Sequence, residues 1–432
     1  MQTAISSGHL SAGELRVAER VLRACVHCGF CNATCPTYPL LGSELEGPRG
    51  RIYLIKSVLE QRIPLDRAVV GHLDNCLSCL ACETTCPSGV RYSHLIDPAR
   101  ALIEREYTRP LAERLQRALL ARLLPYPGRF RLMLRLGRLA RPLRWLLPRA
   151  LRANLALLPR RIPARSSLAS RAQHPAEGPR RARVALLTGC AQQVLGPDIN
   201  DATLRLLTRL GCEVVVPPEA GCCGALVYHM GDRPGSLPHM RRNIDAWCAA
   251  MDEGGLDAVI LNTSGCGTVV KDYGHIFQDD PDYKDKAARV AALARDVTEF
   301  VAHLGVPAAL RRPVAPLRVA YHDACSLQHG QRVRAQPRDL LRAAGFEVSE
   351  VPQGHLCCGS AGTYNLLKPD NAQALGRAKA EALAEVSPQA VAAGNIGCME
   401  QIAHYSAVPV VHTVELLDWA TGGPRPKALP SP

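Results

Sequence analysis

Short apolar stretches alternate with longer stretches of helical periodicity throughout the second half of the chain. The apolar stretches are Val184–Thr188, Ala258–Asn262, Val319–His322 and Ala390–Ala393. Apolar residues recur at helical spacing over 200–210, 239–253, 285–304, 335–344 and 371–386. Strands that alternate with helices are typical of βαβ units, so this pattern predicts parallel sheets.

The first 182 residues follow a mainly helical pattern. Gly47 and Pro48 predict the start of one helix, and residues 98–106 predict another with proline in its first turn. Leucines recur at helical spacing over 108–165, where prolines divide the segment into short helices. Residues 164–182 are predicted to be a flexible linker.

Positive charge is concentrated in the middle segment. Residues 108–165 contain 15 Arg and one Glu, with no Lys and no Asp, so their charge of +14 exceeds the formal charge of +13 of the whole chain, and the rest sums to −1. Basic amphipathic helices are typical of surfaces that bind membrane lipid or a partner protein; the alternative is a set of helices packed on the main domain with an Arg-rich solvent face. Nucleic acid is not expected as a partner, because aromatic residues make up only 4% of the chain and no recognised binding motif occurs.

The chain contains 18 cysteines. Its first twenty residues lack the apolar core of a secretory signal peptide, and no apolar run reaches the roughly 18 residues of a spanning helix. A cytoplasmic location is therefore expected. In a reducing compartment, clustered cysteines are metal ligands or catalytic thiols more often than disulfides.

Eight cysteines fall in two runs with the same spacing. Both runs, Cys25–Pro36 and Cys76–Pro87, have the form C-x2-C-x2-C-x3-C-P. This is the bacterial ferredoxin pattern for [4Fe–4S] clusters, in which the fourth cysteine of each run binds the other cluster. The first cluster is therefore assigned to Cys25, Cys28, Cys31 and Cys86. The second is assigned to Cys76, Cys79, Cys82 and Cys35.

Zinc is a weaker interpretation of these runs. A zinc site has no use for a third and fourth cysteine at a fixed spacing that occurs twice. Between the runs, Arg49, Arg51 and Lys56 are candidates to lie around the anionic clusters. A solvated basic face is the alternative for Arg51 and Lys56.

The remaining chain contains an internal repeat built on Cys-Cys-Gly. Cys190 precedes Cys222 by 32 residues, and Cys325 precedes Cys357 by the same distance. The two halves lie 135 residues apart at these markers, which indicates a duplication. Each marker follows a predicted strand, so four thiols in each half are expected at the carboxyl edge of a sheet.

Three chemistries fit the cysteines of this repeat. They are an unusual iron–sulfur cluster, a redox-active dithiol and zinc; a shared cluster is favoured, because a disulfide between adjacent cysteines is strained. The candidate further cluster ligands are Cys190, Cys222, Cys223, Cys266, Cys325, Cys357, Cys358 and Cys398. His322, His329 and His355 are candidates to tune or bind a cluster, with ordinary structural roles as the alternative. Cys212 and Cys248 lie outside the pattern and are expected to be buried.

Together these patterns predict an α+β fold. A helical N-terminal two-[4Fe–4S] ferredoxin-type domain is followed by a duplicated α/β Cys-Cys-Gly region with parallel sheets. The expected domains are 1–107 for the ferredoxin-type domain and 108–182 for the Arg/Leu-rich segment and linker, then 183–312 and 313–432 for the first and second Cys-Cys-Gly modules.

In this layout the chain resembles the glycolate oxidase (glycolate dehydrogenase) iron–sulfur subunit family over nearly its full length. The stretches that carry the resemblance are Cys25–Cys31, Gly47–Lys56, Glu83–Tyr92, Ala220–Ala225 and His355–Tyr364. The wider family includes the iron–sulfur subunits of anaerobic glycerol-3-phosphate dehydrogenase and heterodisulfide reductase, and lactate utilisation proteins.

The resemblance implies an electron-transfer subunit with two [4Fe–4S] clusters and a candidate further iron–sulfur cluster at the Cys-Cys-Gly modules. FAD-containing partner subunits would oxidise glycolate to glyoxylate, and this subunit would pass electrons towards membrane quinone or another acceptor at the cytoplasmic face of the inner membrane. The sequence agrees, because it contains no dinucleotide fingerprint and no P-loop. The alternatives are the same role in D-lactate or glycerol-3-phosphate oxidation, and a thiol/disulfide reductase acting at the Cys-Cys-Gly sites.

Overall fold

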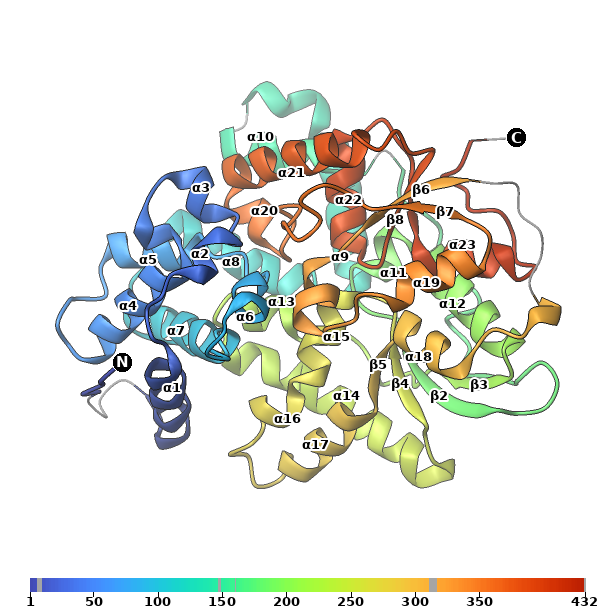
Figure 1. The fold of residues 1–432 in the computed structure, drawn as a ribbon, viewed down its shortest axis with the longest axis horizontal. Coiled ribbons are helices and arrows are strands. Elements are labelled where there is room, and N and C mark those ends of the chain that lie inside the picture. Colours follow the sequence, from blue (N-terminus) through green and yellow to red (C-terminus); the bar gives the residue numbers. More distant parts are fainter. Residues whose placement is uncertain (6–9, 147–148, 160, 311–316, 431–432) are drawn as a thin grey trace.

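A computed structural model describes residues 1–5, 10–146, 149–159, 161–310 and 317–430 (Figure 1). A helical N-terminal part precedes two separate sheets, so the predicted α+β fold class is confirmed. The boundary predicted between residues 312 and 313 lies outside the described residues.

Short helices build the N-terminal part around one apolar core. They are α1 (Ala12–Ala24), α2 (Phe30–Ala33), α3 (Thr37–Leu41), α4 (Pro48–Leu59), α5 (Arg67–Asp74), α6 (Ala81–Thr85) and α7 (Ser93–Glu106), with a 3-10 turn, η1 (Glu44–Glu46). Helix α4 begins at Pro48, as predicted. The helix predicted from residue 98 was too short, because α7 begins at Ser93 and contains Pro98 in its interior. Buried Leu95 and Ile103 on either side of Pro98 hold that helix against the core.

The Arg-rich middle segment forms short helices ended by prolines, as predicted. They are α8 (Leu111–Leu123), α9 (Pro127–Ala140), η2 (Arg141–Leu146) and α10 (Arg149–Ala156). The flexible linker predicted over 164–182 was wrong in part. Its residues 173–174 form strand β1 (Gln173–His174), which pairs antiparallel with β3 (Cys212–Val215), and the His174 side chain is buried.

The first Cys-Cys-Gly module contains a five-stranded sheet in the order β1-β3-β2-β4-β5. Its parallel strands are β3, β2 (Ala182–Leu187), β4 (Ala258–Leu261) and β5 (Ala294–Asp296). Its helices are α11 (Gln192–Leu195), α12 (Pro197–Arg209), α13 (Ala225–His229), α14 (Arg233–Gly254), α15 (Ser264–Lys271), α16 (Tyr273–Ile276), α17 (Lys284–Leu293) and α18 (Val297–Leu304), followed by η3 (Ala308–Leu310). The single helix predicted over 285–304 is instead two helices, because β5 lies between them and Asp296 caps α18.

The second module repeats the parallel part of this sheet in the order β7-β6-β8-β9. The strands are β6 (Arg318–His322), β7 (Glu347–Ser349), β8 (Ala390–Ala393) and β9 (Val410–His412). The helices are η4 (Ser326–Gly330, a π-helix), α19 (Gln336–Ala343), α20 (Tyr364–Leu367), α21 (Pro369–Ala384), α22 (Ile396–Tyr405) and α23 (Thr413–Ala420). Because β6, β7, β8 and β9 take the places of β2, β3, β4 and β5, the predicted duplication is confirmed in the topology.

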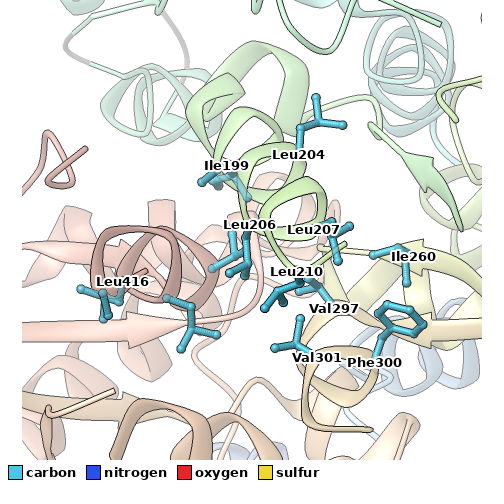
Figure 2. Close-up of a cluster of buried hydrophobic side chains, with 14 of the residues drawn as sticks. Ile199, Leu204, Leu206, Leu207, Leu210, Ile260, Val297, Phe300, Val301 and Leu416 are labelled. Atoms are coloured by element: carbon cyan, nitrogen blue, oxygen red, sulfur yellow. The ribbon is translucent and has the colours of Figure 1, made fainter. Parts of the chain in front are cut away.

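The two modules share one apolar core. Figure 2 shows Leu206 and Leu210 of α12 near Leu416 of α23, with Val301 of α18 beside them. Helix α12 contacts α23, and α18 contacts α19. Each leucine buried at this junction stabilises it by roughly 1.5–3 kcal/mol, so the halves form one folded body.

Candidate metal centres

Two hollows in the N-terminal part hold the eight cysteines of the ferredoxin-type runs. The first, with a volume of about 430 Å³, is lined by Cys25, Cys28, Cys31 and Cys86, and also by Cys82. The second, with a volume of about 320 Å³, is lined by Cys35, Cys76, Cys79 and Cys82. The structure thus brings together the two sets of four cysteines that the spacing predicted. The two hollows are neighbours, because both are lined by Pro48, Cys82 and Tyr92.

The backbone has the same unusual conformation in both runs. His27 and Gly29 have φ angles of 57° and 85°, and Ser78 and Leu80, at the same positions of the second run, have 48° and 62°. Left-handed residues between right-handed ones turn successive amides towards a common centre, where they favour an anion. The Ser78 amide donates to Cys76 Sγ at 3.4 Å. Both loops are therefore shaped to hold negatively charged sulfur.

A buried arginine lies beside the second hollow. Arg51 is 1% exposed, forms an ion pair with Glu46 at 2.9 Å and approaches Cys35 Sγ to 4.0 Å. Arg49 lines the first hollow. Lys56 lines neither hollow and forms its ion pair elsewhere. Two of the three basic residues singled out from the sequence therefore lie at the candidate centres, and Arg51 is not part of a solvated face.

Burial disfavours ionisation of the thiols in these hollows unless a cation lies nearby. Burial and the neighbouring Cys25 raise the pKa of Cys31 to about 11. Burial also raises the pKa of Cys79 and of Cys82 well above the usual range. The thiolate is the form that binds metal, and a cationic iron core offsets the cost of ionisation. Four thiols in each hollow, converging amides and a nearby arginine fit a [4Fe–4S] cluster.

Sequence reasoning missed two polar residues at the second hollow. Tyr92 Oη donates to Cys76 Sγ at 3.8 Å. Arg100 donates to Ser78 Oγ at 2.7 Å and to the Cys76 carbonyl at 2.6 Å, and both side chains are buried. No spacing distinguishes Arg100 from the other arginines of the chain, because the course of α7 alone brings it to the loop.

In each Cys-Cys-Gly module the four thiols interact in the same order. In the first module, Cys190 interacts with Cys222, Cys222 with its neighbour Cys223, and Cys223 with Cys266. In the second module, Cys325 Sγ lies 3.9 Å from Cys357 Sγ, Cys357 interacts with its neighbour Cys358, and Cys358 with Cys398. The eight thiols predicted to gather at two sheet edges therefore do so. Cys212 and Cys248 are buried apart from them, as expected.

A glycine closes each adjacent cysteine pair. Gly224 and Gly359 have φ angles of 81° and 84°, which other residues rarely adopt. Their amides donate to Cys222 Sγ and Cys357 Sγ, each at 3.4 Å. The turn therefore fixes the first sulfur of each pair and supplies it with a donor.

The second module lies directly against the second hollow. Side chains of the second ferredoxin-type run pack there with residues of the module, in a cluster that includes Leu77, Cys79, Cys325 and Cys357. Thr84 Oγ1 and His329 Nδ1 are hydrogen-bonded at 2.7 Å across this contact. The first module meets the N-terminal part through polar contacts instead, such as Glu14–Arg233 and Asp97–His229.

Known protein families match both parts of this arrangement. The family model described as a 4Fe-4S dicluster domain matches residues 21–90. The model described as a cysteine-rich domain matches twice, at residues 184–271 and 319–403.

Several known proteins are similar to the chain. The glycolate oxidase iron-sulfur subunit of Escherichia coli is 43% identical over 420 residues, which cover 97% of this chain and 99% of that protein. The probable glycolate oxidase iron-sulfur subunit of Bacillus subtilis is 34% identical over 430 residues, covering 94% and 96%. Lactate utilization protein A of Bacillus subtilis is 28% identical over 243 residues, covering 55% and 99%.

A solved structure shares the fold. The crystal structure of a hypothetical protein from Helicobacter pylori aligns with a TM-score of 0.55 at 10% identity, over 97% of this chain and 74% of that one. Within the described part of the chain, no helix combines the length and apolar character needed to span a membrane.

Proposed function

The chain belongs to the family of glycolate oxidase iron–sulfur subunits, and on that basis we propose that it carries electrons from FAD-containing subunits towards membrane quinone or another acceptor. The flavin subunits would oxidise glycolate to glyoxylate. The observation that carries the proposal is the pair of adjacent hollows, one lined by five cysteines and the other by four, with Cys82 common to both. Two-electron oxidation of a hydroxy acid suits a flavin, whereas a relay of single electrons suits thiol-bound iron.

We assign the two ligand sets of this relay to the two hollows. Cys25, Cys28, Cys31 and Cys86 would hold one [4Fe–4S] cluster, and Cys35, Cys76, Cys79 and Cys82 the other. Each cluster supplies one-electron redox chemistry when bound. The Ser78 amide and Arg51 would stabilise the negative charge at the second centre. Tyr92, which lines both hollows, would hold the two centres next to each other.

Glycolate-driven reduction in the assembled complex tests this function. The full chain would be purified anaerobically with its partner subunits, mixed with glycolate and examined by electron paramagnetic resonance. The expected result is signals from two reduced [4Fe–4S] clusters. Reduction of the clusters by D-lactate or glycerol 3-phosphate, with glycolate inert, would overturn the assignment of glycolate as the substrate. A complex without iron and acid-labile sulfide would overturn the relay.

Burial disfavours the alternative of a thiol/disulfide reductase. Cys222, Cys223, Cys357 and Cys358 are each at most 3% exposed. Burial and neighbouring thiols raise the pKa of Cys223 and Cys357 well above the usual range. Reactive cysteines are accessible and have a lowered pKa, so these thiols have the opposite properties.

We further propose that the outer face of α8 and α9 binds an anionic membrane surface. Leu111, Leu115 and Leu119 follow one face of α8 and are 55% to 68% exposed. Leucines of α9 and a tryptophan of η2 continue the exposed apolar face: Leu132, Leu136, Leu139 and Trp145. The exposed basic residues around it are Arg114, Arg122, Arg129, Arg135, Arg138 and Arg141. Alternating leucines and arginines suit lipid tails and phosphates better than the charge-depleted centre of a protein interface.

The inner face of this helix pair is anchored to both modules. Gln116 donates to the Leu366 carbonyl at 2.9 Å, and Arg117 donates to the Met230 carbonyl at 3.3 Å.

Flotation with vesicles tests the outer face. The full chain should float with vesicles that contain anionic lipid and not with neutral ones, and Leu115→Glu should abolish flotation. Tyr53→Glu, at an exposed apolar residue of α4, is the matched control. Equal flotation of Leu115→Glu and the unaltered chain would overturn the proposal.

A further inference from the structure

A buried histidine in the second Cys-Cys-Gly module has no hydrogen-bond partner. His322, the last residue of β6, is 2% exposed, and neither ring nitrogen is hydrogen-bonded. A polar atom removed from water is unfavourable unless it is hydrogen-bonded or binds a metal. One ring nitrogen of His322, Cys358 Sγ and Cys398 Sγ all lie within 4.8 Å of one another. The unpartnered imidazole therefore faces two thiols, which are typical metal ligands.

The spacing of these three donors suits a single ion. Two donors at about 2.0–2.3 Å from a tetrahedral zinc ion lie roughly 3.3–3.8 Å apart, so donors that already lie within 4.8 Å of one another need only small side-chain shifts to bind one ion. Among the residues that the structure describes, this is the one group of three His, Cys, Asp or Glu donors that is so compact. The ferredoxin-type thiols are spread around wider hollows, as a cluster with an iron in front of each thiolate requires.

The other two histidines singled out from the sequence do not join this group. His329 Nδ1 is hydrogen-bonded to Thr84 Oγ1, and its Nε2 lies 3.2 Å from the His355 carbonyl oxygen. The His355 side chain is not among the three compact donors. Of the three, His322 is therefore the one whose ring lies in the compact group of donors.

The first module has no nitrogen ligand at the corresponding position. Leu187 ends β2 and pairs with Leu261 of β4, just as His322 ends β6 and pairs with Ala393 of β8. Leu187 packs in an apolar cluster that includes Cys223. The position that would supply the nitrogen ligand of a mixed nitrogen–sulfur site is thus occupied by His322 in the second module and by Leu187 in the first.

We propose that the second Cys-Cys-Gly module binds one tetrahedrally coordinated zinc ion through His322, Cys358 and Cys398. Mixed nitrogen and sulfur donors in tetrahedral geometry suit zinc. Binding releases the protons of the two thiols, so that two thiolates balance the charge of the ion. Cys357, whose thiol interacts with that of Cys358 but lies outside the compact group, would have to move towards the ion to take the fourth position. An iron–sulfur cluster, which the cysteine pattern favoured, would need a wider spacing than this group has.

Metal analysis of the anaerobically purified full chain tests the site, and its readout is independent of glycolate oxidation. The unaltered chain should contain about one zinc ion in addition to its cluster iron. Zinc-edge X-ray absorption should show nitrogen at about 2.0–2.1 Å and sulfur at about 2.3 Å. His322→Leu, which copies the first module, should lose the zinc and keep the iron, the sulfide and the signals of both clusters. Cys223→Ser, in the first module, should keep the zinc.

Four results would overturn the site. The first is an unaltered chain without zinc, and the second is a His322→Leu variant that retains it. The third is a loss of four irons and their sulfide from that variant, which would identify a cluster instead of a single ion. The fourth is a zinc absorption spectrum of the unaltered chain that shows sulfur ligands alone, which would exclude His322. This last result does not require that His322→Leu folds.

Discussion

In both Cys-Cys-Gly modules the second cysteine of the pair packs among apolar side chains, Cys223 with Ile244 and Cys358 with Leu327. In the second module the first cysteine of the pair, Cys357, also packs against Leu77 and Cys79 of the ferredoxin-type run. Strand order, the order of thiol contacts and the closing glycine are otherwise the same in both modules. The difference shows that a duplicated scaffold acquires a new chemical environment through its neighbours and a few side chains, while the order of its parallel strands stays the same.

The largest effect is expected from removing a cluster ligand. The two ferredoxin-type centres should then differ in whether the second module is also affected, because, among the described residues, it is the second hollow that packs against that module. Cys79→Ser and Cys28→Ser should each remove one cluster and lower glycolate-driven electron transfer of the complex by more than about 100-fold, because each removes a ligand. Cys79→Ser should also disturb the second module, since Cys79 packs against Cys357. Iron and zinc contents of both variants measure this. Zinc loss in Cys28→Ser alone would contradict the placement.

Two glycine variants compare the turns that close the cysteine pairs. Gly359→Ala should lower the free energy of unfolding by about 2–4 kcal/mol, because the new Cβ would meet the Ala372 carbonyl oxygen at 2.8 Å in addition to the strain of a left-handed φ. Gly224→Ala should cost only about 1–2 kcal/mol, since its closest neighbour is the flexible Met240 side chain. Urea unfolding measures both. An equal or larger loss for Gly224→Ala would contradict the prediction that the Ala372 carbonyl oxygen is harder to displace than the Met240 side chain.

The residues that cap α18 and α23, the last α-helices of the two modules, should contribute to stability with opposite dependence on pH. Burial raises the pKa of Asp296 to about 6 and lowers the pKa of His412 to about 4, and both residues cap their helices. Asp296 folds preferentially in its protonated form, so its stabilising contribution is lost as pH rises from about 4 to 6. His412 folds preferentially in its neutral form, so its contribution is lost as pH falls from about 6.5 to 4.

Replacing each cap by asparagine should therefore give opposite trends. The stability of Asp296→Asn relative to the unaltered chain should rise by about 2–3 kcal/mol between pH 4 and 8, and that of His412→Asn should rise by a similar amount between pH 8 and 4. Urea titrations at both pH values measure these differences. Parallel trends in the two variants would refute the assignment.

The smallest expected effect concerns the contact between the second run and the second module. Thr84→Val removes the hydrogen bond to His329 and should lower the free energy of unfolding by about 1 kcal/mol. The neighbouring Thr85→Val is the control, and hydrogen exchange near residues 326–330 should increase in Thr84→Val alone. Equal exchange in both variants would mean that the hydrogen bond does not hold the module in place.

Local spacing predicted the cysteine runs that line the two hollows and the duplication, because both depend on regular intervals along the chain. The strands β5, β7 and β9 were missed, since three residues are too few to show a period, and the four-residue β3 was missed as well. Arg100 and Tyr92 reach the second hollow through the course of the helix and loop that carry them, which no local pattern records. His322 was singled out together with two other histidines, and the missing hydrogen-bond partners that distinguish it exist only in three dimensions.

The reciprocal contacts between α12 and α23 and between α18 and α19 have an evolutionary consequence. The helices that follow β2 and β6 are α12 and α19, and those that end the modules are α18 and α23, so the two contacts are related by an approximate two-fold axis. That is the geometry of an isologous homodimer whose subunits have become joined in one polypeptide. An ancestor with a single Cys-Cys-Gly module would then have been a dimer, and fusion would have freed each half to diverge.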